Sequence, residues 1–318
     1  MASKASVFID GESGTTGLGI RDRLSALPNV TLKSLPTERR RDPAARRDMM
    51  AQVDLVILCL PDDAAKESVA IAESLGGDAP KILDASTAHR VHPDWEYGFP
   101  EMLPEQADRI TAARKVANPG CYPTGAIGLI RPLVDAGLIP PDYPITINAV
   151  SGYSGGGKAM IEAHETEGGP AFELYGLNLE HKHLPETQLY SGLSRRPIFV
   201  PSVGHFRQGM LISVPLHLDP LPTKPATADL VAVLQERYRG AKLVRVIPPE
   251  PDGRLEPQAL NNTDALELSV YSSDKHRQAV LVARLDNLGK GASGAAVQNV
   301  GLMLGWHAAA AVREKADA

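Results

Sequence analysis

The sequence predicts an α/β fold class in which a doubly wound, mostly parallel sheet is joined to an inserted α+β domain with a largely antiparallel sheet. Three observations lead to this prediction. The first third alternates short apolar runs with helical patterns, a glycine-rich turn follows the first apolar run, and later segments alternate polar with apolar residues. The chain has 318 residues, more than one small domain usually holds, so we expect about two hydrophobic cores.

Strands and helices alternate through the first third of the chain. We expect strands at 6–9, 30–35, 55–60 and 81–84, and helices over 17–26 and 63–74. The strand segments are short and β-branched, as in parallel sheets that helices cover on both faces. This order predicts a first domain over residues 1–120. A long apolar helix over 294–312, rich in Ala and Gly, leads us to expect that residues 292–318 complete it.

Residues 121–291 follow a different pattern. After a helical pattern over 124–136, we expect strands at 144–150, 198–200, 210–217, 243–247, 265–271 and 278–285, with a loop at 220–225. Their polar and apolar residues alternate, which indicates antiparallel strands with one covered face. The segment is therefore expected to form the inserted α+β domain.

The composition narrows the class of function. The chain is 43% hydrophobic and 22% charged, with a formal net charge of -5, and it has no basic patch of the kind that binds nucleic acid or an anionic membrane. No window approaches the ~18 apolar residues that span a bilayer, and the N-terminal residues lack the apolar centre of a signal peptide. We expect a soluble, cytoplasmic protein with a small-molecule substrate.

A glycine-rich turn directly follows the first expected strand and precedes a helix. Small residues at this place let backbone N–H groups approach a pyrophosphate at the helix N-terminus. We therefore expect a Rossmann domain, although a purely structural tight turn is the alternative. The expected cofactor contacts in the turn are Gly11, Ser13, Gly14, Thr15, Thr16 and Gly17.

The cofactor is expected to be NADP(H). An NAD site usually has an acidic residue about 20 residues beyond the glycines, which binds the ribose 2′-hydroxyl. Here the chain has Arg39, Arg40 and Arg41, and guanidinium groups suit a 2′-phosphate. Glu38 leaves NAD as an alternative, and a solvated basic loop is the non-functional interpretation.

The two cysteines have different surroundings. Cys59 ends an apolar run and has the character of a small buried hydrophobe, whereas Cys121 lies in a turn-like segment. Neither has the spacing of a metal site, and we expect no metal. Pro123 suits the first turn of a helix, which places the Cys121 sulfur near the positive end of a helix dipole. A thiol attacks as thiolate, so Cys121 is the candidate nucleophile.

Four further segments carry a resemblance that spans nearly the whole chain. They are NPGCYPTGA at 118–126, SGYSGGGK at 151–158, HKHLPE at 181–186 and NLGKGASGAAVQN at 287–299, and they follow GESGTTG at 11–17. In this order they resemble the shorter subtype of the N-acetyl-gamma-glutamyl-phosphate reductases, whose plan is similar to that of aspartate-semialdehyde dehydrogenase and glyceraldehyde-phosphate dehydrogenase.

The resemblance implies an activity in arginine biosynthesis. It would be the NADPH-dependent reductive dephosphorylation of N-acetyl-gamma-glutamyl phosphate to N-acetyl-L-glutamate 5-semialdehyde, through a thioester on Cys121. The resemblance also implies a homo-oligomer, either a dimer or a tetramer, assembled through residues 121–291. Further cofactor contacts are expected at Cys59, Pro61, Ser86, Asn287 and Gly291.

A base for the thiol proton is expected in HKHLPE. Both His181 and His183 are candidates, and in an extended segment residues two apart would share a face. We favour His183 narrowly. Glu186 either orients one of the imidazoles or is exposed. His164 and His205 have weaker claims and are expected to be surface or structural residues.

Several residues are candidates for binding the anionic substrate. Small donors and one cation after a strand suit a phosphate or carboxylate, although a flexible hairpin loop is the alternative. Ser86 and Arg90 follow a strand of the parallel sheet, at the edge where ligands bind. Arg207 is displaced by one position from the basic residue of the family motif, which puts its role in doubt. The expected substrate contacts are Arg90, Asn118, Ser151, Gly152, Ser154, Lys158, Glu186 and Arg207.

Three other functions remain open at this stage. Aspartate-semialdehyde dehydrogenase is the nearest enzymatic alternative, and an acetylaminoadipyl-phosphate reductase would take a substrate one methylene longer, a difference worth only about 1–3 kcal/mol in a pocket. An NADP-binding redox sensor would bind the cofactor without turnover and would tolerate serine at Cys121.

Overall fold

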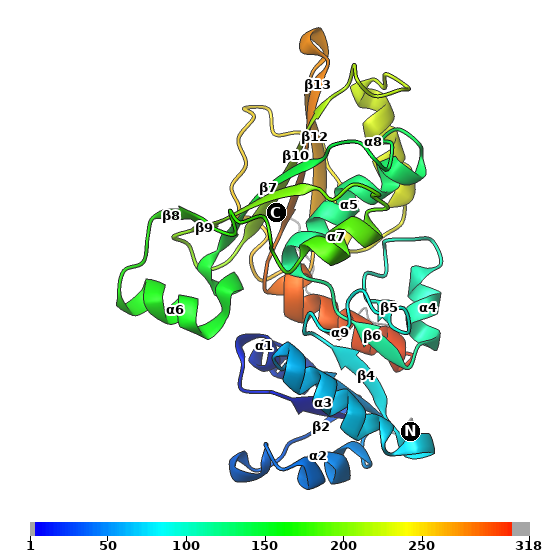
Figure 1. Cartoon of the computed structure of the whole chain (residues 1–318), viewed down its shortest axis with the longest axis vertical. Coiled ribbons are helices and arrows are strands. Elements are labelled where there is room, and N and C mark those ends of the chain that lie inside the picture. Colours follow the sequence, from blue (N-terminus) through cyan, green and yellow to red (C-terminus); the bar gives the residue numbers. More distant parts are fainter. Residues whose placement is uncertain (1–3, 307–318) are drawn as a thin grey trace. The chain divides into compact units, whose positions relative to one another are not determined.

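The computed structural model describes residues 4–306 and shows two compact units (Figure 1). Within the described residues, the first unit comprises 4–100, 105–119 and 292–306, and the second comprises 101–104 and 120–291. The chain passes from the first unit to the second between Pro119 and Gly120, directly before Cys121. Each unit is built around its own sheet.

The first unit contains a six-stranded sheet in the order β2-β1-β3-β4-β6-β5, and every pair in it is parallel. Its strands are β1 (Ala5–Asp10), β2 (Val30–Lys33), β3 (Leu55–Leu58), β4 (Lys81–Asp84), β5 (Glu96–Tyr97) and β6 (Lys115–Ala117). The expected parallel sheet is therefore confirmed. Strands β2 and β3 each end two residues earlier than the apolar pattern predicted.

Helices cover both faces of this sheet, as the apolar strands require. They are α1 (Thr15–Ser25), α2 (Pro43–Met50), α3 (Asp62–Glu73), α4 (Gln106–Ala112) and α9 (Gly294–Met303). Val7 and Ile57 pack with side chains of α1, α4 and α9, whereas their neighbours Phe8 and Val56 pack with α2 and α3. Successive strand residues point to opposite faces, so the two cores lie on opposite sides of the sheet.

The C-terminal helix is shorter than expected. It ends at Met303, because Gly305 has a φ of +71° and turns the chain. The helix predicted over 294–312 is therefore wrong for residues 304–306. The remainder of that prediction, residues 307–318, lies outside the described residues. The sequence pattern also did not indicate α2, whose first turn is capped by the Asp42 carboxylate.

The second unit contains a seven-stranded sheet in the order β11-β12-β13-β10-β7-β9-β8. Its strands are β7 (Thr146–Gly152), β8 (Phe172–Leu174), β9 (Ile198–Gly204), β10 (Met210–His217), β11 (Val244–Val246), β12 (Leu266–Ser273) and β13 (Gln278–Leu285). Most pairs are antiparallel, as expected. The pairs β7 with β9 and β11 with β12 are parallel, which the alternating pattern did not predict.

The helices of the second unit are α5 (Cys121–Asp135), α6 (Gly157–Thr166), α7 (Leu184–Tyr190) and α8 (Thr227–Arg237). Helix α5 packs on strands β10, β12 and β13, and α7 and α8 pack against α5. Gly125 allows this close approach, since a Cβ at this position would lie 2.6 Å from the side chain of Ile212. In the described part of the chain, no helix is long and apolar enough to cross a membrane.

Candidate active site

Cys121 is the first residue of α5, three residues earlier than the predicted helix start. Gly120 is the N-cap, and its N–H donates to the Glu186 carboxylate at 3.1 Å, while its carbonyl accepts from the Thr124 hydroxyl at 2.9 Å. Pro123 lies in the first turn, as expected. The thiol is thus at the end of a 15-residue helix where N–H groups stabilise negative charge on sulfur.

The backbone of Gly291 lies against Cys121. A Cβ added to Gly291 would lie 2.9 Å from the Cys121 Cβ and 3.1 Å from the carbonyl oxygen of Asp286. Gly291 is part of a π-helical turn, Gly289–Ser293, whose first N–H groups donate to that same carbonyl. Only glycine fits this position without displacing the nucleophile, so the place of Gly291 is set by its contact with Cys121.

His181 and His183 lie together in the second unit, and their segment is not extended. They form a turn that leads into α7, of which His183 is the N-cap, and their ring centroids are 4.8 Å apart. Tyr122 meets both imidazoles edge to face at 6.0 Å. Since Tyr122 directly follows the nucleophile, the histidines are adjacent to the start of α5.

The two histidines differ in their proton positions. Nδ1 of His181 accepts a hydrogen bond from the backbone N–H of His183 at 3.1 Å, so the proton of the neutral ring is assigned to Nε2. Burial, and to a smaller extent the charge of Lys182, lower the pKa of His181 to about 4. His181 is therefore a neutral donor near pH 7. His183 is more deeply buried, at 6% exposure.

Aromatic side chains enclose this pair. His181 is edge to face with Phe199 at 5.1 Å, and the Tyr175 hydroxyl donates to the Tyr122 hydroxyl at 3.2 Å. Burial and the neighbouring Tyr175 raise the pKa of Tyr122 far above its usual value, so its phenol stays protonated. The aromatic groups that contact the histidines are thus uncharged.

Glu186 is buried at 1% exposure, so the alternative of an exposed carboxylate is wrong. Its carboxylate accepts a hydrogen bond from the Gly120 N–H. Glu186 therefore fixes the backbone directly before Cys121, across 66 residues of sequence.

The segment 151–158 connects the end of β7 to α6 through a short 3-10 helix, Tyr153–Gly156, and is not a hairpin loop. Ser151 and Gly152 end β7, and a Cβ on Gly152 would lie 2.5 Å from the backbone N of Gln208. Ser154 accepts from the Asn287 amide at 2.9 Å, and the Asn287 oxygen accepts from the Gly209 N–H at 2.8 Å. Asn287 thus links the loop to the residue that precedes β10, whereas the sequence led us to expect a cofactor contact.

Lys158 and Arg207 are exposed at the surface of this unit. Arg207 forms an ion pair with Glu165. Close by, His164 is buried, stacks on Tyr153 at 4.7 Å, and shares a hydrogen bond of 3.0 Å between its Nδ1 and that of His205. The latter pair joins α6 to the end of β9, which fits the expected structural role.

In the first unit, the glycine turn connects β1 to α1. Gly11 has a φ of +88°, and a Cβ there would lie 2.4 Å from the carbonyl oxygen of Cys59. A Cβ on Gly17 would lie 2.7 Å from the Gly11 carbonyl oxygen. Gly14 is the N-cap of α1, Thr15 and Thr16 form its first turn, and Ser13 is exposed. The turn therefore presents the N-terminus of α1, as a pyrophosphate site requires.

A cavity of about 340 Å³ opens beside this turn. Gly11, Ser13, Glu38, Arg40 and Arg41 are among the residues that line it. The Arg40 guanidinium also pairs with the buried carboxylate of Glu12 at 2.6 Å. Arg39 pairs instead with Asp42 at 3.1 Å and does not line the cavity, so only part of the arginine run faces it.

Cys59 and Pro61 follow β3 near this turn. Burial, with the charges of Asp84 and Asp10, raises the pKa of Cys59 to about 12, which agrees with an unreactive thiol. Pro61 is the N-cap of α3.

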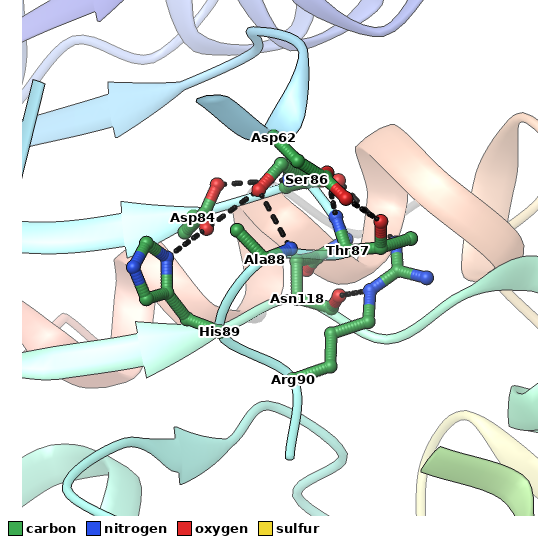
Figure 2. A network of polar contacts seen from close by, with 9 residues as sticks. Asp62, Asp84, Ser86, Thr87, Ala88, His89, Arg90 and Asn118 are labelled. Atoms are coloured by element: carbon green, nitrogen blue, oxygen red, sulfur yellow. Dashed lines mark hydrogen bonds and ion pairs between the residues drawn. The ribbon is translucent and has the colours of Figure 1, made fainter. Parts of the chain in front are cut away.

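Figure 2 shows a polar network at the end of β4, centred on the fully buried Asp84. Its carboxylate accepts from the Ser86 hydroxyl at 2.7 Å and contacts Nδ1 of His89 at 2.6 Å. His89 stacks on Trp95 with a centroid distance of 4.3 Å. The next residue, Arg90, donates to the carbonyl oxygens of Asn118 and Ala85. The loop therefore holds Arg90 against the backbone that leads to Cys121.

Asn118 is itself fixed within the first unit. Its amide donates to the Ala292 carbonyl at 3.2 Å, and its side-chain oxygen accepts from Asn299 at 3.1 Å. Among residues 4–306, no group of three or more His, Cys, Asp or Glu side chains is placed to hold a metal ion.

Comparison with known proteins decides the family. Residues 121–287 match the model of the semialdehyde dehydrogenase dimerisation domain, and residues 28–110 match that of the semialdehyde dehydrogenase NAD binding domain. The N-acetyl-gamma-glutamyl-phosphate reductases of Brucella ovis and Brucella abortus are each 53% identical over 310 residues, which covers 95% of this chain and 99% of theirs. The chain belongs to the N-acetyl-gamma-glutamyl-phosphate reductase family. The match to a dimerisation domain indicates that it oligomerises.

Solved structures support the fold of this N-acetyl-gamma-glutamyl-phosphate reductase family member. Aspartate-semialdehyde dehydrogenase II from Vibrio cholerae is 17% identical, covers 96% of this chain and 100% of its own, and has a TM-score of 0.71. The enzyme from Candida albicans, solved with NADP, has a TM-score of 0.67 at 17% identity and covers 95% of this chain and 99% of its own. The two-part prediction of a Rossmann unit and an α+β unit is confirmed.

Several residues of the site were not indicated by the sequence pattern. Glu12, Asp84, His89 and Asn299 are buried polar groups that anchor the expected site residues. Glu12 pairs with Arg40, 28 residues away, and Asn299 bonds to Asn118, 181 residues away, whereas Asp84 and His89 contact each other and are 5 residues apart. Only the pair Asp84 and His89, which are close together in the chain, carried a local signal.

Proposed function

We propose that the chain catalyses the NADPH-dependent reductive dephosphorylation of N-acetyl-gamma-glutamyl phosphate to N-acetyl-L-glutamate 5-semialdehyde, a step of arginine biosynthesis. The observation that carries the proposal is a thiol at the N-terminus of α5, with the imidazoles of His181 and His183 adjacent to that helix start, in a chain 53% identical to reductases of this name. This set of groups suits acyl transfer to sulfur.

Cys121 is the proposed acylation site. Its sulfur attacks the acyl carbon of the substrate, a C–S bond forms, and the C–O bond to phosphate breaks, so that inorganic phosphate leaves. The acyl group is already activated by phosphate, and a thiolate displaces it without a strong acid. The helix N-terminus stabilises the thiolate before attack and after the aldehyde departs. Glu186 supports this geometry by fixing Gly120.

We propose that His183, rather than His181, carries the proton. His181 uses Nδ1 as an acceptor from the backbone and has a pKa of about 4, so near pH 7 it serves as a neutral donor through Nε2. His183 takes the thiol proton before attack and returns a proton when the thiohemiacetal collapses.

The residues of the first unit fit NADP(H). The left-handed Gly11 and the close approach at Gly17 leave room for a pyrophosphate at the start of α1, and Arg40 and Arg41 line the adjoining cavity. When bound, NADPH supplies the hydride that reduces the thioester. Ser13, Thr15 and Thr16 are proposed to bind the phosphates, with Arg40 holding the 2′-phosphate.

For the substrate, we propose that Arg90 and the loop 151–158 bind its anionic groups. Arg90 donates to two carbonyl oxygens, and these contacts orient its guanidinium. Ser151, Gly152 and Ser154 are fixed by their own backbone contacts and by Asn287, so the loop is preorganised.

The proposed assembly is a homo-oligomer formed through the second unit, in the cytoplasm. The exposed apolar side chains of this unit support it. Phe172 and Leu174 lie on the edge strand β8, Leu177 follows this strand in the sequence, and Ile198 begins the neighbouring strand β9. Such side chains usually mark a protein interface.

The test runs the reaction in reverse, with N-acetylglutamate semialdehyde, phosphate and NADP⁺, and follows NADPH. We expect turnover by the wild type, a fall of at least 1000-fold in Cys121→Ser, and a larger loss of kcat in His183→Ala than in His181→Asn. Asn retains an acceptor in place of Nδ1, which makes it the matched control. Aspartate semialdehyde and the homologue one methylene longer are compared by kcat/KM. Absence of NADPH formation by the wild type would remove the proposal.

A further inference from the structure

Lys290 is a lysine that lies almost entirely inside the protein. It is 1% exposed and ranks among the largest fully buried side chains of the described residues. Lysine is rarely buried unless its ammonium is paired. Neither the expected cofactor contacts nor the expected substrate contacts include it.

The ammonium of Lys290 forms an ion pair of 2.8 Å with the carboxylate of Glu101, whose side chain is 12% exposed. Glu101 begins the short segment 101–104, which belongs to the second unit although the residues on both sides of it belong to the first. The Met102 carbonyl of the same segment accepts from Arg237 on α8. The ion pair therefore joins two parts of the second unit that are 189 residues apart.

The backbone of Lys290 is part of the π-helical turn Gly289–Ser293. Its neighbour Gly291 is the residue whose Cα faces the Cys121 Cβ, with no room for a side chain. On the other side, the Asp286 carbonyl accepts from Gly289 and Gly291, and the Asp286 carboxylate accepts from Gln208 at 2.6 Å. Such single π turns are frequent at functional sites, where a local insertion re-aims the backbone.

We propose that the buried Lys290–Glu101 ion pair is a positioning device for the nucleophile. It holds the π turn so that Gly291 packs against Cys121 and fixes the thiol at the helix N-terminus. Lys290 and Glu101 do not touch the reacting atoms in this account. They act through Gly291, and the inference rests on the proposed function only for its kinetic readout.

Stability and positioning can be separated at this pair. Removing one partner leaves a buried charge without its counterion and strongly destabilises a protein, whereas replacing both by apolar residues of similar volume is often neutral. A purely structural pair would therefore be restored in every respect by the double replacement. A positioning pair would be restored in stability but not in the reactivity of Cys121.

The experiment compares Lys290→Met/Glu101→Met with the wild type. A matched control is the buried pair of Arg284 and Glu267, 2.6 Å apart, with both replaced by Met. Arg284 points away from α5, because its strand neighbour Ala283 lies 3.1 Å from where a Gly125 Cβ would be. Four quantities are measured: the melting temperature, the rate at which iodoacetamide alkylates Cys121 (followed by peptide mass spectrometry), and kcat and KM for the semialdehyde.

For Lys290→Met/Glu101→Met we expect a near-wild-type melting temperature, Cys121 alkylation at least fivefold slower, and kcat at least tenfold lower with KM within threefold. The control pair is expected to change neither reactivity nor kcat by more than twofold. If the Met double variant does not fold, Lys290→Gln/Glu101→Gln, which also removes both charges but keeps polar side chains of similar size, takes its place, and the same slower alkylation is expected.

If Cys121 in the folded variants is alkylated at the same rate as in the wild type, the proposal is overturned. The alkylation arm needs no substrate and no cofactor, so it decides the role of the ion pair even if the wild type forms no NADPH. The failure of this inference is therefore distinguishable from the failure of the proposed function.

Discussion

Replacing Gly291 by Ala tests the contact behind the nucleophile. The new methyl carbon would lie 2.9 Å from the Cys121 Cβ, whereas carbon atoms in contact are usually about 3.5–4.0 Å apart, so a displacement of about 0.6 Å or more is required. The turn cannot retreat, since the same methyl group would lie 3.1 Å from the Asp286 carbonyl oxygen, which accepts from the turn itself. The displacement therefore falls on Cys121.

A misplacement of about 1 Å at a reacting group costs about 100-fold in rate. We expect Gly291→Ala to lower kcat by about 10- to 100-fold, and overpacking to cost about 1–3 kcal/mol of stability. The assay measures kcat in the NADPH-forming direction, the melting temperature and the affinity for NADP⁺. The control is Gly77→Ala, whose Cβ would meet nothing within 4 Å. A folded Gly291→Ala with kcat within twofold of wild type would refute this reasoning.

Three further predictions concern the cofactor, the histidines and the second thiol. Arg40→Ala should raise KM for NADPH at least tenfold and KM for NADH less than threefold, whereas Arg39→Ala, outside the cavity, should change both less than twofold. The pKa of His181 is about 4 in the folded chain and about 6.5 in the unfolded chain. Between these values the unfolded chain binds more protons, so the stability of the fold decreases as the pH is lowered from 6.5 to 4. The free energy of unfolding is measured in urea at pH 7 and pH 4.5. Between these pH values, His181→Asn should lose about 1 kcal/mol less than the wild type, after allowance for the partial exposure of His181. An equal loss in the two proteins would count against the lowered pKa of His181. Cys59, with a pKa of about 12, should stay unmodified by iodoacetamide at pH 7.5 while Cys121 reacts, as the masses of the labelled peptides would show; early labelling of Cys59 would contradict its raised pKa.

The parts of the fold that follow from local patterns were predictable. Strands β10 and β13 have the expected bounds, because alternation and β-branched residues are properties of the segment itself. The parallel pairing of β7 with β9 was not predictable, since the neighbours of a strand are chosen by tertiary contacts. Helix α6 was missed because its sequence, GKAMIEAHET, begins with glycine, a poor helix former, and buries only His164 among its side chains.

The same division holds for the candidate site. Cys121 and the two histidines are found in short motifs, so their residue types and spacing indicate their chemistry. Glu186 and Lys290 depend on partners 66 and 189 residues away, and a local pattern carries no information on such pairs. An extended conformation was one possibility for HKHLPE, but Pro185 lies in the first turn of α7, where its fixed φ favours the helix.

The central claim is that Cys121 becomes acylated. Wild-type enzyme is mixed with N-acetylglutamate semialdehyde and NADP⁺ without phosphate. The reaction is quenched in acid, the protein is digested, and the masses of its peptides are measured by mass spectrometry. The account predicts one N-acetylglutamyl group on the peptide that contains Cys121, formed together with an equal amount of NADPH, and neither in Cys121→Ser. An acyl group on another residue, or NADPH formed by Cys121→Ser at the wild-type level, would contradict it.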